Sequence, residues 1–242
     1  MNAVVVGASS GLGRALATEL ARRGDELLLV ASDPRDLEAL AADLTLRHGA
    51  DVRTLALDLA READPGARIR AALDAQPLSA LLLPIGNSRD DDDLTLDAAR
   101  IGELIAINLH APLAIVHALL PALREARGVV VLFGSVAAVR GRGRNVVYAA
   151  AKRALVSLYE SLRQRHAPDE LRVQLYQLGF LATNLTHGLR LPVPALAPDA
   201  AARAVVARLG RGSGLRYLPA KFALIAAIVR LLPWPLYRKM KS

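Results

Sequence analysis

Short apolar runs alternate with longer helical patterns from residue 3 to about residue 178, and this alternation restricts the fold more than any other feature of the chain. Parallel strands need a crossover connection, usually a helix, so the alternation predicts repeated βαβ units in one parallel sheet. We predict strands at residues 3–6, 26–30, 52–56, 80–83, 129–133 and 173–178, and helices at residues 12–23, 36–47, 98–123 and 147–166.

The composition suits such a sheet and narrows the chemistry. Hydrophobic residues form 53% of the chain but aromatic residues only 4%, so Ala, Leu and Val must build a core in which strands are buried on both faces. With 242 residues we predict a single α/β domain, residues 1–242. The absence of cysteine excludes disulfides and thiolate chemistry, and the five histidines show no metal-ligand spacing, so no metal site is predicted.

The end of the chain carries basic residues without acidic partners. The formal net charge is +8, and no acidic residue follows Asp199. The tail, about residues 217–242, combines these cations with an apolar segment at 222–229, which is too short to span a bilayer, where roughly 20 apolar residues are needed. With Trp234 and Tyr237, this composition predicts either a basic amphipathic helix on an anionic membrane or a helix docked on the core or in a dimer interface.

Other partners and locations are less consistent with the sequence. The tail lacks an aromatic stacking platform, so we expect no nucleic-acid partner. The chain opens directly on a strand-like run, and we expect no cleaved secretory signal. These features predict a cytoplasmic protein, peripheral at the inner face of the membrane if the tail binds lipid. The acidic run at residues 90–93 is interpreted as a solvated loop or helix start, with metal binding as a minor alternative.

A glycine-rich turn follows the first predicted strand and precedes a helix. Glycines permit a tight turn and a close approach of the backbone to a pyrophosphate, and a helix N-terminus offers N–H groups and a favourable dipole to that anion. A glycine triplet also occurs in ordinary strand-to-helix turns, so it is weak by itself. The candidate phosphate-binding residues are Gly7, Ser9, Ser10, Gly11, Leu12 and Gly13.

A possible acid–base group lies farther along the chain. Tyr148 and Lys152 are four residues apart in a predicted helix, so both side chains reach one site. A nearby ammonium favours the phenolate and lowers the pKa of a tyrosine. A packed ring beside a solvated amine is the plainer interpretation of this pair alone. Ser135 follows a buried strand, at the edge where ligands bind in open α/β sheets, and its hydroxyl could bond a substrate oxygen.

The glycine spacing together with Ser135, Tyr148 and Lys152 resembles the short-chain dehydrogenase/reductase family. The resemblance implies a Rossmann-type, doubly wound parallel sheet and an NAD(P)(H)-dependent enzyme that interconverts a carbonyl and a secondary alcohol. It implies that Tyr148 transfers the proton, Ser135 positions the reacting oxygen, and Lys152 binds the nicotinamide ribose and lowers the tyrosine pKa. Asn108 matches the family's fourth catalytic position, where it interrupts regular helical bonding and helps hold a water that links the lysine to solvent.

The same resemblance guides the choice of cofactor. By our alignment, Ala31 stands where the family has the acidic residue that binds NAD, and Ser32 stands at the usual arginine position. With Ser32, Arg35 and Arg14 available, NADP(H) is favoured. NAD(H) is the alternative, because Asp33 could bind the ribose after a small loop shift.

Further cofactor contacts are assigned by alignment. Asp58 and its neighbour Leu59 fit the adenine pocket, although a helix N-cap at Asp58 is an alternative. Two family motifs are altered: Leu83-Pro84-Ile85-Gly86 replaces Asn-Asn-Ala-Gly, and Leu178-Gly179 replaces Pro-Gly. Gly86 and Gly179 keep the permissive backbone, and Thr183 keeps a hydroxyl that often meets the carboxamide of the cofactor. Residues 184–197 should form the substrate loop.

The altered motif, the arginine-rich stretch at 140–144 and the tail resemble the decaprenylphosphoryl 2-keto-erythro-pentose reductases. This resemblance implies a keto-sugar on a polyprenyl phosphate, with Arg140, Arg142 or Arg144 near the phosphate. A solvated loop is the alternative for these arginines. The competing functions are a generic cytoplasmic carbonyl or alcohol dehydrogenase and a non-catalytic NADP-binding regulator or scaffold. The family resemblance also favours a homo-oligomer, a dimer or tetramer.

Overall fold

The computed structural model describes residues 1–183, 186, 188 and 193–240. Its centre is one parallel sheet of seven strands in the order β3-β2-β1-β4-β5-β6-β7. The order reverses between β1 and β4, as the doubly wound prediction requires. The strands are β1 Asn2–Val6, β2 Glu26–Ala31, β3 Val52–Ala56, β4 Ala80–Leu83, β5 Val129–Ser135, β6 Arg172–Leu178 and β7 Gly214–Leu218.

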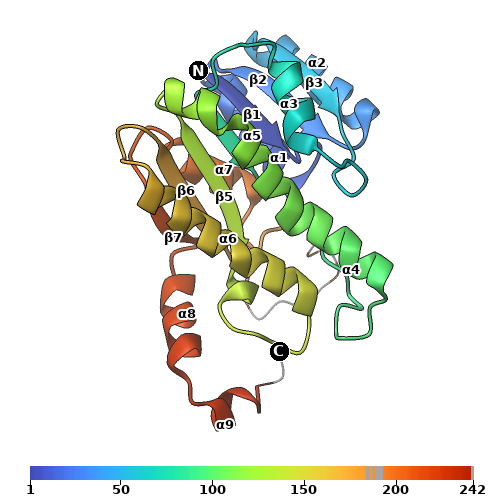
Figure 1. Cartoon of the computed structure of the whole chain (residues 1–242), viewed down its shortest axis with the longest axis vertical. Helices are drawn as coiled ribbons and strands as arrows, with labels where there is room; N and C mark the ends of the chain where they lie inside the picture. The colour runs from blue at the N-terminus through green and yellow to red at the C-terminus, as the bar shows by residue number, and fades with distance from the viewer. Residues whose placement is uncertain (184–185, 187, 189–192, 241–242) are drawn as a thin grey trace.

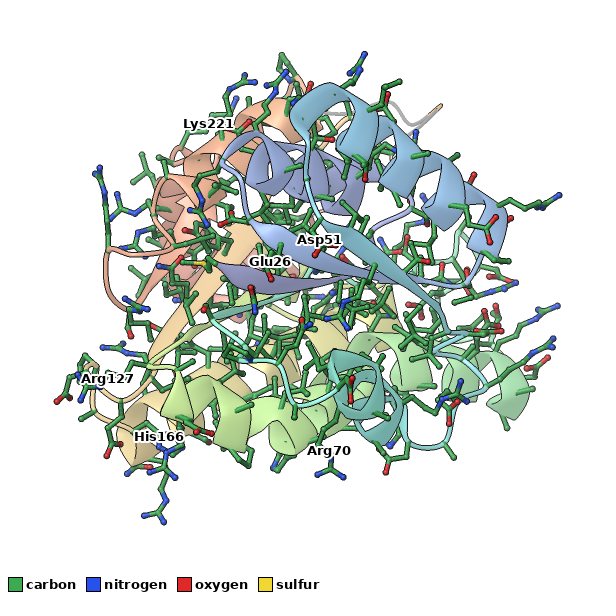
Figure 2. The ribbon with its side chains drawn as sticks, turned by 90° about the horizontal axis from the view of Figure 1, so that it is seen from above. Glu26, Asp51, Arg70, Arg127, His166 and Lys221 are labelled. Atoms are coloured by element: carbon green, nitrogen blue, oxygen red, sulfur yellow. The ribbon has the colours of Figure 1, made fainter. Side chains whose placement is uncertain are left out.

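Helices cover both faces of the sheet and complete a three-layer domain (Figure 1). Seen from above, Glu26 and Asp51 mark the sheet as the middle layer, and Arg70 and His166 lie on the helical layer beneath it (Figure 2). One face is covered by α1 Gly11–Arg22, α2 Pro34–His48 and α7 Pro198–Val206. The other is covered by α3 Pro65–Leu73, α5 Ala111–Glu125 and α6 Val146–Arg165, with α4 Ala98–Ile105 leading into α5.

Local sequence signals explain where the helices begin and end. Asp33 accepts a hydrogen bond from the backbone N–H of Arg35 and caps α2, which starts with Pro34 at its first position. Gly49 ends the same helix in the left-handed conformation, with φ of 64°. Asp64 caps α3 by accepting from the N–H of Ala67. Asp58 therefore caps no helix, and the N-cap alternative for it is wrong; its carboxylate accepts from Ala60 N–H in the turn before α3.

The predicted helix at residues 98–123 is interrupted. A π-helical turn, η1 Ala106–His110, separates α4 from α5 and contains Asn108. Residues 98–125 are apolar and long enough to cross a membrane by length and composition. Ile115, Leu119 and Leu123 are buried in the core that covers one face of the sheet, so one side of the helix packs against the core.

The C-terminal part of the chain contains an element that we did not predict. β7 pairs in parallel with β6 and forms the edge of the sheet, although all five of its residues are only half-buried. The predicted apolar helix is confirmed as α8 Phe222–Leu231, and a short helix, α9 Trp234–Tyr237, follows. Figure 1 shows both extending beyond the carboxyl end of β7, away from the layered body.

The turn from β1 into α1 depends on close packing at Gly13. A Cβ at this position would lie 1.9 Å from the carbonyl oxygen of Gly7, so backbone atoms would have to move. We expect Gly13→Ala to lower the free energy of unfolding by about 1–3 kcal/mol, the usual cost of overpacking. Urea denaturation measures this change.

The control is Gly102→Ala, because Gly102 lies in α4 and a Cβ there would meet no described atom within 4 Å. This control should be neutral or stabilising by roughly 0.5–1 kcal/mol. Equal stability of Gly13→Ala and wild type would show that the turn is not tightly packed.

Candidate active site

The carboxyl ends of four neighbouring strands bring the predicted site residues together. Gly7 follows β1, Gly86 lies just beyond β4, Ser135 ends β5, and Gly179 follows β6. Because all the strands are parallel, these residues lie along one edge of the sheet, around the point where the strand order reverses. The edge is thus the candidate site for a nucleotide and its reaction partner.

The glycine loop has the backbone geometry needed to bind a phosphate group. Gly7 and Gly11 have positive φ values of 88° and 49°, which glycine adopts at little cost. Ser10 is the N-cap of α1, but its side chain makes no capping bond to any described residue. The N-terminus of α1, which includes Leu12 and Gly13, therefore lies at this turn without a side-chain cap. Its backbone N–H groups are the donors that an anion site requires.

The Ser135 hydroxyl lies close enough to Tyr148 to influence the pKa of its phenol. Ser135 is the last residue of β5, and its Oγ accepts from the backbone N–H of Ala137, 3.1 Å away. Burial raises the pKa of Tyr148 above its ordinary value of 10.0, and the neighbouring Ser135 hydroxyl opposes this effect only in part. The phenol is therefore held in its protonated form at neutral pH.

Lys152 lies one helical turn after Tyr148 and is buried, with 3% of its surface exposed. Its Nζ donates to the backbone carbonyl oxygens of Ile85, at 2.5 Å, and Phe133, at 3.2 Å. Burial lowers the pKa of Lys152 to about 8. The expected lowering of the Tyr148 pKa by Lys152 is not found, since burial dominates the tyrosine and the amine lies 5.9 Å from the centre of its ring.

Asn108 joins η1 to the loop after β4. Its Nδ2 donates to the carbonyl of Leu104, 2.9 Å away, and to that of Asn87, 2.8 Å away, while its Oδ1 accepts from Asn87 N–H at 3.1 Å. The side chain is fully buried, and a Cβ on Gly86 would lie 3.8 Å from Oδ1 and 3.5 Å from Lys152 Nζ. Asn108, Gly86 and Lys152 are therefore neighbours.

At the other end of the site, the residues after β2 are already engaged with one another. Both carboxylate oxygens of Asp33 accept from the guanidinium of Arg35, the shorter contact being 2.9 Å, and this pairing lowers the pKa of Asp33. Ser32 is exposed. Asp58 lies in an exposed turn, with Leu59 half-buried against the core beside it.

Gly179 and Thr183 have neighbours that alignment did not reveal. A Cβ on Gly179 would lie 2.2 Å from the ring of Phe222, so this glycine makes room for the first residue of α8. Thr183 lies beside the glycine loop, because a Cβ on Gly11 would lie 3.0 Å from its Cγ2. Within the predicted substrate loop, residues 184–185, 187 and 189–192 lie outside the described residues; its ends are joined by a bridge between Leu181 and Leu196.

Two residues at the site were missed or misjudged. Asn87 was not predicted as a site residue, although its backbone N–H donates to the side chain of Asn108 and its backbone carbonyl accepts from the same side chain. Asp92 was interpreted as part of a solvated run, but only 1% of its surface is exposed and it binds the first turn of α6. The run of four acids concealed it, since nothing in the sequence distinguishes Asp92 from its neighbours. Within the described part of the chain, no group of three or more potential metal ligands forms.

The buried amine predicts a pH dependence of stability. Because the pKa of Lys152 is about 8 in the folded protein and 10.5 ordinarily, the unfolded chain binds more protons between these values. The free energy of unfolding should therefore rise with pH from 8 to 10, by on the order of 2 kcal/mol from this residue. Lys152→Met should lack this rise, and urea denaturation across the pH range measures it.

Lys221→Met is the matched control, because Lys221 is exposed at the start of α8. It should retain the wild-type dependence on pH. Identical slopes for Lys152→Met and wild type would contradict the desolvated state of this amine.

Comparison with known proteins supports the same picture. The family model for short chain dehydrogenase matches residues 1–193. A very-long-chain 3-oxoacyl-CoA reductase of Aspergillus fumigatus is 27% identical over 88% of this chain, which spans 63% of that reductase. An uncharacterized oxidoreductase of Myxococcus xanthus is 32% identical over 97% of this chain and 94% of its own length.

The fold is shared with solved structures as well. A short-chain dehydrogenase from Sphingobium yanoikuyae, in complex with NADPH, superposes with a TM-score of 0.83 at 26% identity, covering 100% of this chain and 96% of its own. The family model covers most of the chain and includes the glycine loop, Ser135, Tyr148 and Lys152. The chain belongs to the short-chain dehydrogenase family.

Proposed function

We propose that the protein is an NADPH-dependent reductase of a carbonyl compound, with Asn108, Ser135, Tyr148 and Lys152 as its catalytic group. The observation that carries this proposal is the meeting, at the sheet edge that holds the glycine loop, of Ser135 at the end of β5 with Tyr148 and the buried amine of Lys152 on α6. This arrangement provides a proton donor, an orienting hydroxyl and a cation at one edge of the sheet.

Each side chain has a role that follows from its position. Ser135 orients the carbonyl oxygen of the substrate, and Tyr148 donates its phenolic proton to that oxygen. Bound NADPH supplies the hydride. Lys152, whose pKa is about 8, is able to exchange a proton near neutral pH and return it to the tyrosine. Asn108 fixes the loop after β4 and thereby the carbonyl of Ile85, to which Lys152 donates.

The residues at the cofactor end fit NADPH better than NADH. The backbone at Gly7, Gly11 and Gly13 accommodates a pyrophosphate beside the N-terminus of α1. Asp33 is occupied as the cap of α2 and as the partner of Arg35, so it is poorly placed to bind ribose hydroxyls. Arg35 is paired with the same Asp33, but its side chain is 88% exposed, and with the exposed Ser32 it can meet a 2′-phosphate. The NADPH complex of the Sphingobium yanoikuyae relative supports this preference.

Substitution of the tyrosine tests the proposal. Tyr148→Phe should lower kcat for NADPH-dependent ketone reduction by about 10²–10⁴-fold, since the proton donor is lost. Fluorescence titration should show tight NADPH binding, weaker NADH binding, and no change of either in the variant.

The matched control is Tyr159→Phe, because Tyr159 lies on the same helix with its hydroxyl accepting from Arg163. This control should keep full activity. NADPH binding without turnover in the wild type would favour the regulator or scaffold alternative, whereas failure to bind either nucleotide would refute the oxidoreductase assignment.

We further propose that the substrate is lipid-linked and approaches along the tail. α8 buries Phe222 and Ala226 but leaves large apolar side chains exposed, among them Leu224 at 69%, Leu231 at 83% and, in the next helix, Trp234 at 63%. No acidic residue follows Asp199, so every charged side chain of the tail is basic. Exposed apolar side chains in a basic segment suit the interface of an anionic membrane.

The tail is attached to the loop that precedes Tyr148. Arg140 Nη1 donates to the carbonyls of Val229, at 3.0 Å, and Leu232, and its guanidinium stacks 4.1 Å from the centre of the Tyr237 ring. Arg140 therefore holds the end of α8, and we assign the phosphate-binding role to Arg142 and Arg144 instead. A keto-sugar on a polyprenyl phosphate is the substrate class that these features favour.

A double substitution tests the lipid-linked substrate. Arg142→Gln with Arg144→Gln should reduce activity on a keto-sugar polyprenyl phosphate about 10-fold or more, because charge-assisted bonds to phosphate are lost. Activity on a simple ketone should be unchanged. Equal activity of this variant and wild type on the lipid substrate would contradict the assignment.

The control is Arg70→Gln with Arg124→Gln, two exposed arginines on α3 and α5. It removes the same charge without touching the loop and should retain both activities.

Sedimentation with anionic and neutral vesicles measures membrane binding by the tail separately. Binding to neither kind of vesicle, with self-association instead, would favour the predicted dimer or tetramer interface. A simple ketone as the better substrate would favour a generic carbonyl reductase.

A further inference from the structure

The N-terminus of the helix that carries Tyr148 is not capped by the side chain of its own N-cap residue. α6 starts at Val146, and its N-cap residue, Asn145, has φ of 54° and makes no side-chain capping bond to any described residue. The first intrahelical bond is donated by Ala149 to the carbonyl of Asn145. The N–H groups of the preceding three residues need other partners, and Tyr148 is the third of them.

One distant residue accepts all three of these hydrogen bonds. The N–H of Val146 donates to the backbone carbonyl of Asp92 at 3.3 Å, that of Val147 to its Oδ1 at 3.0 Å, and that of Tyr148 to its Oδ2 at 3.0 Å. Asp92 is buried, and among the described residues no Lys or Arg pairs with it. Its partners are the helix N–H groups, and the helix dipole favours a negative charge at this end.

Asp92 belongs to the same loop that contacts the other catalytic candidates. This loop follows β4 and includes Ile85, whose carbonyl accepts from Lys152, and Asn87, which pairs with Asn108. Farther on, Asp91 pairs with Arg89 and Arg100 and so stiffens the turn that presents Asp92. The loop therefore fixes the backbone of Tyr148 relative to Lys152 and Asn108.

We propose that Asp92 is the positioning residue for Tyr148, acting through the first turn of α6. The inference rests on the proposed function, since it concerns the placement of the phenol that donates the proton. The phenol must meet both Ser135 and a substrate oxygen, and loss of the cap would allow the first helical turn to fray and displace it. Binding of NADPH would not depend on this displacement.

Alanine and asparagine substitutions test the proposal. Asp92→Ala removes both side-chain acceptors and should lower kcat about 100-fold, the size expected when a reacting group is misplaced by about 1 Å. Asp92→Asn keeps one acceptor oxygen and should fall between alanine and wild type. KM for the ketone and Kd for NADPH should stay within about twofold of wild type, because the loss lies in the chemical step.

Asp90→Asn is the matched control, as the same charge is removed from an exposed position two residues away. It should be fully active. Backbone amide exchange of Val147 and Tyr148, followed by NMR, should be faster in Asp92→Ala and unchanged in Asp90→Asn. This measurement reports the cap without any need for turnover.

The outcomes separate this inference from the proposed function. An inactive wild type that binds NADPH would refute the reductase, while the amide exchange would still test the cap. An active wild type with kcat unchanged in Asp92→Ala would overturn the positioning role. A loss of kcat that matches the loss of NADPH-binding sites would also overturn the positioning role, because it would indicate unfolding. Faster amide exchange together with a lower kcat per bound NADPH would establish the positioning role of Asp92.

Discussion

The parallel direction of the seven strands is the constraint on which the site depends. It places the carboxyl end of every strand at one edge of the sheet, so residues separated by more than a hundred positions become neighbours. Gly7 forms the turn proposed to bind phosphate at this edge, and Ser135 supplies a hydroxyl two strands away. Helices on both faces bury the sheet and hold it rigid, and a rigid support is what a reacting group of several side chains requires.

The loop after β4 then converts this edge into an ordered site. It contacts Lys152 through the carbonyl of Ile85, Asn108 through the backbone of Asn87, and α6 through Asp92. The first two contacts use main-chain atoms. For this reason the replacement of the family's Asn-Asn-Ala-Gly by Leu-Pro-Ile-Gly leaves them intact, since the side chains there are free to change while Gly86 keeps the backbone close to Lys152.

Structural features that depend on local sequence patterns could be predicted, whereas features that depend on contacts between distant residues could not. Six strands and the main helices followed from periodicity, and the placement of Gly7 and Ser135 at one edge followed from the parallel sheet. Tyr148 and Lys152 were grouped with Ser135 by their helical spacing and by the family resemblance. β7 was missed because a half-buried edge strand has only a weak alternation of apolar residues. Asp92 was misjudged because its partners lie 54 to 56 residues away and a run of four acids is usually solvated.

Burial shifts the pKa values of Tyr148 and Lys152 in opposite senses, and both shifts bear on the proposed proton transfer. The pKa of the phenol is raised above 10.0 and that of the amine is lowered to about 8, because both neutral forms are favoured away from water. At neutral pH the tyrosine therefore holds its proton beside an amine that gains and loses one readily. A protonated phenol is the group needed to protonate a carbonyl oxygen, whereas oxidation of an alcohol would first require the phenolate. The protonated phenol is therefore the form that the proposed reduction uses.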